Sequence, residues 1–376
     1  MPTLDDFAAE FTDEPGYLDF ATVSPIGEAA MGEERAQSQL MSNARFGSLT
    51  AIVDQEDRVD AAIAALLNVE PEQVVFQPST SQALMHVAFG LTGGIALSSS
   101  EHPATSYAVA RAADALGVLQ ATRFTPDHER VTPASIADAL TGSIAAVAVS
   151  AVDDRTGHLV DLDGIRQVIG DRLLIVDASQ ALGVVEAPWQ CADVIVGTGR
   201  TWLRAGYGTG FLALSDRAAE QLVPVWSGWL AAAGGHGEDR TEQVSPPVSG
   251  ARAYRVGYAD PTAQARLAGA AEEVAQVGVA AIRERVLATC GQIIELADFA
   301  GLSVLSPRDD SERAGIVVVE PPSGAITALT AALHNHGITA AVTGSSVRLS
   351  AHVSTRDDTL TLLRLAFAEF QNMSVT

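Results

Sequence analysis

The sequence predicts an α/β fold, in which a mainly parallel sheet flanked by helices forms a large domain and a small α+β domain follows at the C-terminus. The chain has 376 residues, which suffices for two domains at about 150 residues each. Short aliphatic and β-branched runs alternate with segments of helical spacing up to residue 214. This alternation is typical of parallel strands whose crossover helices cover both faces of the sheet.

Six apolar runs predict the strands of the large sheet. Between two of them, the apolar residues of segment 83–91 fall on one helix face. Thr132 followed by Pro133 predicts the start of another helix. The strands are expected at residues 74–76, 94–98, 144–152, 173–177, 194–197 and 210–214.

The remainder of the chain predicts the smaller domain. Gly, Ser, Pro and acidic residues at 234–250 indicate a loop at a domain edge. A long Ala-rich helix is expected over about residues 262–297, and Ser354 with Asp357 predicts the start of the last helix. Three strands are expected between these helices, at residues 315–320, 337–343 and 346–350.

Composition argues against several classes of partner. The chain carries 23 basic against 46 acidic side chains, a formal charge of −23, and an acidic surface repels nucleic acids and anionic membranes. No apolar run reaches the roughly 18 residues of a membrane span. Cys191 and Cys290 are too far apart for a zinc motif, and the first residues do not resemble a signal peptide. We therefore expect a cytoplasmic protein without a metal site.

All 23 basic residues are arginines, and the chain contains no lysine. An Arg-rich coding bias is the simplest cause. Its chemical consequence does not depend on the cause, because no side-chain amine is available to form a Schiff base.

The strand at 74–76 ends in a hydroxyl-rich turn that starts a helix. Thr80 and Ser81 stand at the first helical positions, where free N–H groups and the helix dipole favour an anion such as phosphate. Ordinary N-capping by Ser79 or Ser81 explains the same residues without a ligand. Taken alone, the turn favours that simpler explanation.

A carboxylate and an amide follow the strand at 173–177. Asp177 ends this strand, at the sheet edge where ligands bind in open α/β folds, and Gln180 comes three residues later. Such a carboxylate can keep a heterocyclic nitrogen protonated, and the amide can bond a ring hydroxyl. Helix capping by Asp177 is the alternative. The Gly-rich segment 197–210 allows the backbone to approach a ligand closely, which is weak support by itself.

The order and spacing of these elements resemble the class V branch of fold-type I pyridoxal-phosphate (PLP) enzymes, which includes cysteine desulfurases, isopenicillin epimerase-like proteins and kynureninases. The resemblance extends from Tyr17-Leu18-Asp19 to the segment 348–352 and so covers nearly the whole chain. It implies a seven-stranded, mainly parallel sheet in a large domain of residues 15–255. It also implies a small domain of residues 1–14 and 256–376 with an interdomain helix, and a homodimer.

The resemblance implies a role for seven residues. Asp177 matches the carboxylate that keeps the pyridine nitrogen protonated, and Gln180 matches the partner of the ring 3-hydroxyl. Arg348 matches the arginine that grips a substrate carboxylate. The phosphate-binding positions of the family correspond to Thr80, Ser81, Thr198 and Arg200.

Three positions depart from the family pattern. Thr201 stands where the family has its Schiff-base lysine. Pro103 replaces a His or aromatic residue that stacks on the pyridine ring, and Tyr258 replaces a Thr that reaches the phosphate of the partner subunit. A Thr hydroxyl forms no Schiff base and is a poor base, so ordinary transamination should be severely impaired.

Four interpretations follow from the missing lysine. The favoured one is a class V aminotransferase-like protein that binds PLP or pyridoxamine phosphate non-covalently and acts on an amino acid or similar amine. The alternative is a non-catalytic homologue that senses a ligand or serves a protein partner, including a partner that inserts its own lysine. A structural protein with an empty pocket is the third. A deliberately mutated lysine is disfavoured, because every other lysine is absent too.

Overall fold

The larger of two sheets has seven strands, as the family resemblance implies. The computed structural model describes residues 3–43, 45, 47–234 and 244–374. All neighbouring strands in this sheet run parallel except those of β7, which is antiparallel to both of its neighbours. In spatial order the strands are β1 (Val74–Gln77), β7 (Gly210–Leu214), β6 (Val194–Thr198), β5 (Leu173–Asp177), β4 (Ile144–Ser150), β2 (Gly93–Ser98) and β3 (Leu119–Phe124).

The six predicted strands are all present, and β3 was not predicted. This strand lies at the sheet edge, and most of its side chains are exposed or half-buried. An edge strand of this kind lacks the continuous apolar run by which buried strands are recognised. The strand predicted at 144–152 ends at Ser150.

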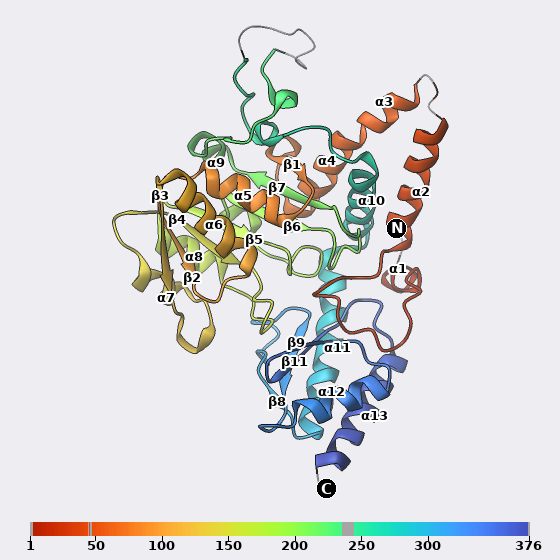
Figure 1. Ribbon diagram of the computed structural model, residues 1–376. Coiled ribbons are helices and arrows are strands. Elements are labelled where there is room, and N and C mark those ends of the chain that lie inside the picture. The colour runs from red at the N-terminus through yellow and green to blue at the C-terminus, as the bar shows by residue number, and fades with distance from the viewer. Residues whose placement is uncertain (1–2, 44, 46, 235–243, 375–376) are drawn as a thin grey trace.

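Helices cover both faces of the large sheet (Figure 1). The sheet separates two apolar clusters, one on each face. In β5, Leu173 and Ile175 point into one cluster, and Leu174 and Val176 point into the other. The helices of this part are α2 (Glu28–Asn43), α3 (Ser48–Val53), α4 (Gln55–Leu67), α5 (Thr80–Gly90), α6 (Pro103–Leu116), α7 (Pro133–Ala139), α8 (Leu162–Ile169), α9 (Asp216–Gln221) and α10 (Pro261–Val277). The short helix α1 (Leu4–Ala9) instead contacts the C-terminal part, where its Asp5 pairs with Arg285. Helix α7 begins as predicted, since Thr132 caps it.

A second, antiparallel sheet forms the centre of the C-terminal part. Its order is β10 (Ala341–Thr343), β11 (Ser346–Ser350), β9 (Ile316–Glu320) and β8 (Ser303–Val304). The helices beside it are α11 (Val279–Phe299), α12 (Ile326–Asn335) and α13 (Asp357–Ser374). In Figure 1, α11 runs from the large sheet to the small one.

Two helix predictions in this region were wrong in detail. The segment predicted as one helix over 262–297 is broken at Gly278, whose φ of 92° is outside the helical range, into α10 and α11. Ser354 does not cap α13, because the helix begins at Asp357 and Ser354 lies two residues before the cap position, where its hydroxyl donates to Asp13 at 2.7 Å. Of the loop predicted at 234–250, residues 235–243 lie outside the described part of the chain. None of the described helices is both long and apolar enough to cross a membrane.

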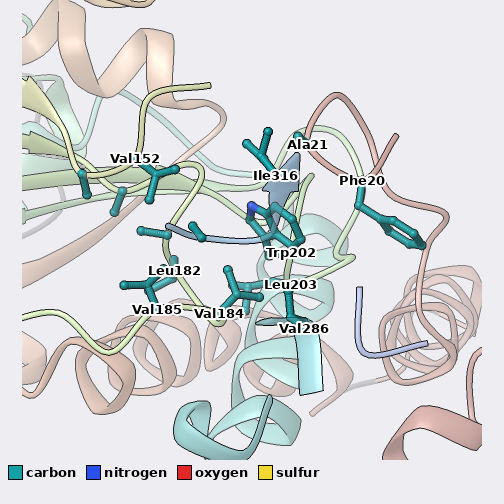
Figure 2. Packing of buried hydrophobic residues seen from close by; sticks show 14 of the residues in the cluster. Phe20, Ala21, Val152, Leu182, Val184, Val185, Trp202, Leu203, Val286 and Ile316 are labelled. Atoms are coloured by element: carbon teal, nitrogen blue, oxygen red, sulfur yellow. The ribbon is translucent and has the colours of Figure 1, made fainter. Parts of the chain in front are cut away.

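The N-terminal segment connects the two sheets. Asp19 pairs with Ser350 of β11, and the following Phe20 and Ala21 are buried in the main apolar cluster. Figure 2 shows this cluster around Trp202, which comes from the large-sheet side, with Ile316 contributed by β9. Thr201, at the position that the resemblance assigns to the family lysine, therefore lies next to the place where the N-terminal segment, the large-sheet part and β9 meet.

Arg204 holds the same three parts together from a fully buried position. Its side chain is 2% exposed and its guanidinium lies 3.9 Å from the ring centroid of Phe11. Nε donates to the carbonyl of Pro25 at 2.8 Å, and Nη1 donates to Asp13 at 2.8 Å and to Ser354 at 3.2 Å. The residue adopts a φ of 58°, which non-glycine residues rarely do. These contacts compensate the cost of burying the charge.

We expect Arg204→Met to lower the free energy of unfolding by about 3–5 kcal/mol, because it leaves the Asp13 carboxylate buried without a counter-charge. Urea unfolding followed by circular dichroism measures this. The double variant Arg204→Met with Asp13→Leu should recover part of the loss. A single variant within about 0.5 kcal/mol of wild type would show that the cluster contributes little.

Candidate active site

A cavity of about 220 Å³ opens at the carboxyl ends of the parallel strands. This is the edge at which open α/β sheets bind ligands. All six residues that were predicted to bind the cofactor line this cavity: Thr80, Ser81, Asp177, Gln180, Thr198 and Arg200. The fold thus gathers these side chains from three separate segments into one cavity.

The N-terminus of α5 forms one end of the cavity. Ser79 accepts a hydrogen bond from the N–H of Gln82 at 3.2 Å, so it caps the helix as the simpler explanation of this turn predicts. The N–H groups of Thr80 and Ser81 remain without an intrahelical acceptor because they belong to the first turn. Gly210 lies beneath this turn, and a Cβ there would come within 3.0 Å of the Ser79 backbone. Capping and an anion site are therefore compatible here.

Arg200 supplies a cation to the same cavity. Its guanidinium forms no hydrogen bond or ion pair with any described residue, and its Cζ lies 5.6 Å from the ring centroid of Tyr207. The Thr198 hydroxyl accepts from the Arg200 N–H at 3.1 Å and donates to the Thr209 carbonyl at 2.9 Å. Thr198 therefore shapes the loop that carries Arg200. A free guanidinium beside free N–H groups is a site suited to phosphate.

Ser179 joins the segments that surround the cavity. Its N–H donates to Asp177 Oδ1 at 2.8 Å, and its hydroxyl lies 3.0 Å from that of Thr80. Its carbonyl accepts from the Thr201 hydroxyl at 2.8 Å. One residue thus links the carboxylate, the α5 N-terminus and the loop that begins at Thr201.

Asp177 also lines the cavity, and it is 7% exposed. Burial raises the pKa of its carboxyl group, against the Ser179 hydrogen bond, which lowers it. Nearby, burial raises the pKa of Glu101 to about 7, although Ser150 donates to this carboxylate through its N–H at 3.2 Å and its hydroxyl at 2.7 Å. A protonated ring nitrogen would supply the positive charge that the buried Asp177 lacks.

Gln180 has its side-chain amide held at both ends. The Trp202 indole donates to its Oε1 at 3.1 Å, and its Nε2 donates to the Ala21 carbonyl at 2.9 Å. These bonds fix which way the amide faces. Because the amide nitrogen carries two hydrogens, one remains for a hydroxyl in the cavity.

Two predicted site residues are not among those that line the cavity. Thr201 is 1% exposed, and its hydroxyl is turned to the Ser179 carbonyl. Arg348 is bonded instead to Asp154, Asp19 and Thr22. Two further positions depart from the family pattern. Pro103 is the first residue of α6, and Tyr258 is 81% exposed, with its ring beside that of Trp229.

Sequence reasoning missed several cavity residues. His102 and Ala104 line the wall on either side of Pro103, and Ser179 and Asp154 also face the cavity. Ser179 could have been found, since it lies within the Asp177–Gln180 motif. His102 belongs to the Glu101-His102 pair within the stretch that resembles the family, but the resemblance gave it no role. Its Nδ1 accepts from the Ala104 N–H at 3.2 Å, which places the proton of the neutral ring on Nε2. No group of three or more His, Cys, Asp or Glu side chains in the described residues is placed to hold a metal ion.

The chain matches a protein family and several known proteins. The family model for Aminotransferase class-V matches residues 17–373. A kynureninase from Deinococcus radiodurans is 27% identical over 281 residues, which cover 71% of this chain and 66% of that protein, slightly less than two thirds of its length. A probable cysteine desulfurase from Methanothermobacter thermautotrophicus is 25% identical over 227 residues, 56% of each protein.

Solved structures match the whole fold. The apo cysteine desulfurase from Thermococcus onnurineus has a TM-score of 0.84 at 18% identity, with 97% of both chains covered. A lysine-to-alanine variant of C-DES with glycine covalently linked to its PLP cofactor has a TM-score of 0.85 at 18% identity, covering 97% of this chain and 99% of that one. The predicted fold-type I architecture is confirmed.

We expect Arg200→Gln to weaken the binding of pyridoxamine phosphate about tenfold to a hundredfold, as the loss of a charge-assisted hydrogen bond does. Pyridoxamine, which has no phosphate, should bind both proteins equally. Calorimetry measures both constants, and Arg111→Gln on the exposed face of α6 is the matched control. Equal losses for the two ligands would remove Arg200 from the phosphate site.

The affinity for pyridoxamine phosphate should fall as the pH is lowered from about 8 to 5, because burial raises the pKa of Asp177 and the protonated acid cannot pair with a pyridinium. Asp177→Asn should bind more weakly and lose this part of the pH dependence. Titration of the ligand phosphate affects the wild type and the variant alike. The difference between their calorimetric pH profiles therefore reports on Asp177. Parallel profiles would contradict the assignment.

Proposed function

Because the chain belongs to the class V aminotransferase family, we propose that it binds PLP or pyridoxamine phosphate non-covalently and acts on an amino acid or similar amine. One observation carries the proposal: Asp177, Gln180, the α5 N-terminus and the free guanidinium of Arg200 share one cavity. Each group can form a further hydrogen bond or ion pair with the matching part of a pyridoxal ring or with its phosphate. The proposal extends to a cytoplasmic homodimer, in keeping with the family resemblance.

The residues of the cavity fit the cofactor in both charge and order. Arg200 and the N–H groups of Thr80 and Ser81 would hold the phosphate, and Asp177 would hold the ring nitrogen in its protonated form. When bound, the cofactor supplies an electron sink for the carbon next to the substrate nitrogen. The Gln180 amide, fixed by Trp202 and Ala21, would orient the ring through its 3-hydroxyl.

Thr201 supports a role without covalent attachment. Its hydroxyl is committed to the Ser179 carbonyl, so the residue contributes to the framework of the site rather than to the cavity surface. A related arrangement is known in this fold: the C-DES variant without its lysine is described with glycine covalently linked to PLP. We propose that this chain likewise holds a cofactor that is joined to its substrate and not to the protein.

Proton transfer would have to proceed without the lysine. His102 is an unsuitable base, because its Nδ1 already accepts a hydrogen bond from the backbone. Asp154 and Asp177 are the carboxylates that line the cavity, and Asp177 is assigned to the ring nitrogen. Asp154 therefore remains as the group that can take up a proton from the substrate. If no turnover is found with any amine, the alternative of a ligand-sensing homologue replaces the catalytic part of this proposal.

Replacing Thr201 with lysine tests the position of the cofactor. The variant Thr201→Lys should react with PLP and, after borohydride reduction, carry a phosphopyridoxyl group on residue 201, found by peptide mass analysis. The wild-type chain should carry none beyond its terminal amine, since it has no lysine.

The natural absence of lysine provides a clean control for this experiment. Arg111→Lys introduces a single lysine on the exposed face of α6, and it should label much more slowly than the variant at position 201. Thermal unfolding of Thr201→Lys establishes that the variant is folded. A folded variant that labels no faster than the control would mean that the cavity does not hold PLP with its aldehyde near this position.

A further inference from the structure

Ser150 is a polar residue of the cavity to which the proposed cofactor binding gives no role. It lines the cavity at the end of β4, and in the sheet it is paired with Asp177 of β5. Ala148 and Ile175, which lie two residues before them, belong to the same apolar cluster. Because side chains alternate along a strand, the Ser150 hydroxyl and the Asp177 carboxylate face the same side of the sheet. Ser150 therefore lies beside the carboxylate that is assigned to the ring nitrogen.

Glu101 fixes the direction of the Ser150 hydroxyl group. Its Oε1 accepts from the Ser150 N–H at 3.2 Å, and its Oε2 accepts from the Ser150 hydroxyl at 2.7 Å. Glu101 is not among the residues that line the cofactor cavity, but with Ser150 it lines a second cavity of about 10 Å³. A hydroxyl that gives its one proton to a carboxylate can act toward other groups only as an acceptor. Toward the cofactor cavity, Ser150 thus presents the lone pairs of its oxygen.

The two carboxylates near Ser150 favour a cation at this place in the cavity. In the described part of the chain, the donors to Asp177 and Glu101 are Ser179 and Ser150, and neither carboxylate forms an ion pair. Burial raises the pKa of Glu101 to about 7, and the negative charge of Asp177 adds to this rise. A ring that carries a charged N–H group would supply the missing positive charge, whereas a neutral ring would not.

We propose that Ser150, together with Asp177, accepts from the protonated ring nitrogen of the cofactor, and that Glu101 is the positioning residue that turns the Ser150 oxygen toward it. The inference rests on the proposed function, because it presupposes that a pyridoxal-type ring occupies the cavity with its nitrogen at Asp177. It adds a requirement to that function: the bound ring must carry an N–H group as well as the shape of the cofactor.

Two ligands that differ only at the ring nitrogen test the role of Ser150. Pyridoxamine phosphate carries the N–H group when its ring is protonated, and its 1-deaza analogue has a C–H group in place of that nitrogen. We expect Ser150→Ala to weaken the binding of pyridoxamine phosphate about threefold to tenfold, as the loss of one hydrogen bond does, and to leave the binding of the analogue within about twofold. Calorimetry at a pH of about 8, where Glu101 is ionised, measures all four constants.

Glu101→Gln tests the positioning role, because it keeps the size of the side chain and changes its hydrogen bonding. The Ser150 N–H can bond only to the amide oxygen, so the amide nitrogen faces the Ser150 hydroxyl and donates to it. The hydroxyl proton is then directed into the cavity, where Asp177 can accept it in competition with the ring nitrogen. We expect Glu101→Gln to weaken the binding of pyridoxamine phosphate at least as much as Ser150→Ala does. In a chain that already carries Ser150→Ala, it should change this binding by less than about twofold.

A neighbouring serine provides the matched control. Ser100 lines the second cavity beside Glu101 but not the cofactor cavity, so Ser100→Ala should bind both ligands as the wild type does. Thermal unfolding shows which variants are folded, and Ser150→Cys, whose sulfur is a weak acceptor, replaces Ser150→Ala if that variant does not fold.

The outcomes separate the inference from the function on which it rests. If the wild type binds pyridoxamine phosphate, an unchanged affinity in Ser150→Ala, or equal losses for the two ligands, would overturn the inference alone. An effect of Glu101→Gln that persists in full without the Ser150 hydroxyl would contradict the positioning role. Failure of the wild type to bind pyridoxamine phosphate would overturn the proposed function as well.

Discussion

The hydrogen bonds of Ser179 are the constraint on which the candidate site depends. Through its N–H, hydroxyl and carbonyl, this residue ties together Asp177, Thr80 and Thr201. These three come from the end of β5, the start of α5 and the loop after β6. In the sheet β6 is next to β5, and β1, which leads into α5, is separated from β6 by β7. The distance between the Asp177 carboxylate and the N-terminus of α5 is thereby set by one residue.

Thr201, at the position that the resemblance assigns to the family lysine, belongs to the hydrogen-bonded framework of the site. A lysine would leave the Ser179 carbonyl without the hydroxyl that now bonds it. The adjoining residues are equally well fixed: Trp202 packs in the cluster of Figure 2 and donates to Gln180, and Arg204 ties the loop to Asp13 and Ser354. The loop is therefore fixed by its own contacts without an amine at position 201, which agrees with the proposed binding of a cofactor in this cavity.

Much of this fold could be predicted from the sequence, because buried parallel strands and helix caps leave local signals. The strands that end in Asp177 and Thr198 are continuous apolar runs, and a family pattern connected their ends. The polar edge strand β3 and the break at Gly278 left no comparable signal. Propensity alone continues an Ala-rich helix through a single glycine, and only tertiary packing decides that it ends there.

The candidate site was predictable where roles depend on position along a strand, and not where they depend on contacts between distant segments. Six expected cofactor residues do line the cavity. Arg348 is different, because its neighbours Asp19, Thr22 and Asp154 are remote in sequence and no local pattern shows that its donors are engaged. The negative charge of Asp154 at the cavity likewise emerges only from the folded chain.

The most direct test of this account is a calorimetric titration of the unmodified protein with pyridoxamine phosphate, which cannot form a Schiff base with any residue. The account predicts saturable binding of about one ligand per chain, with a Kd on the order of micromolar. Absence of binding up to millimolar ligand would mean that the fold has kept the shape of a cofactor site without its function.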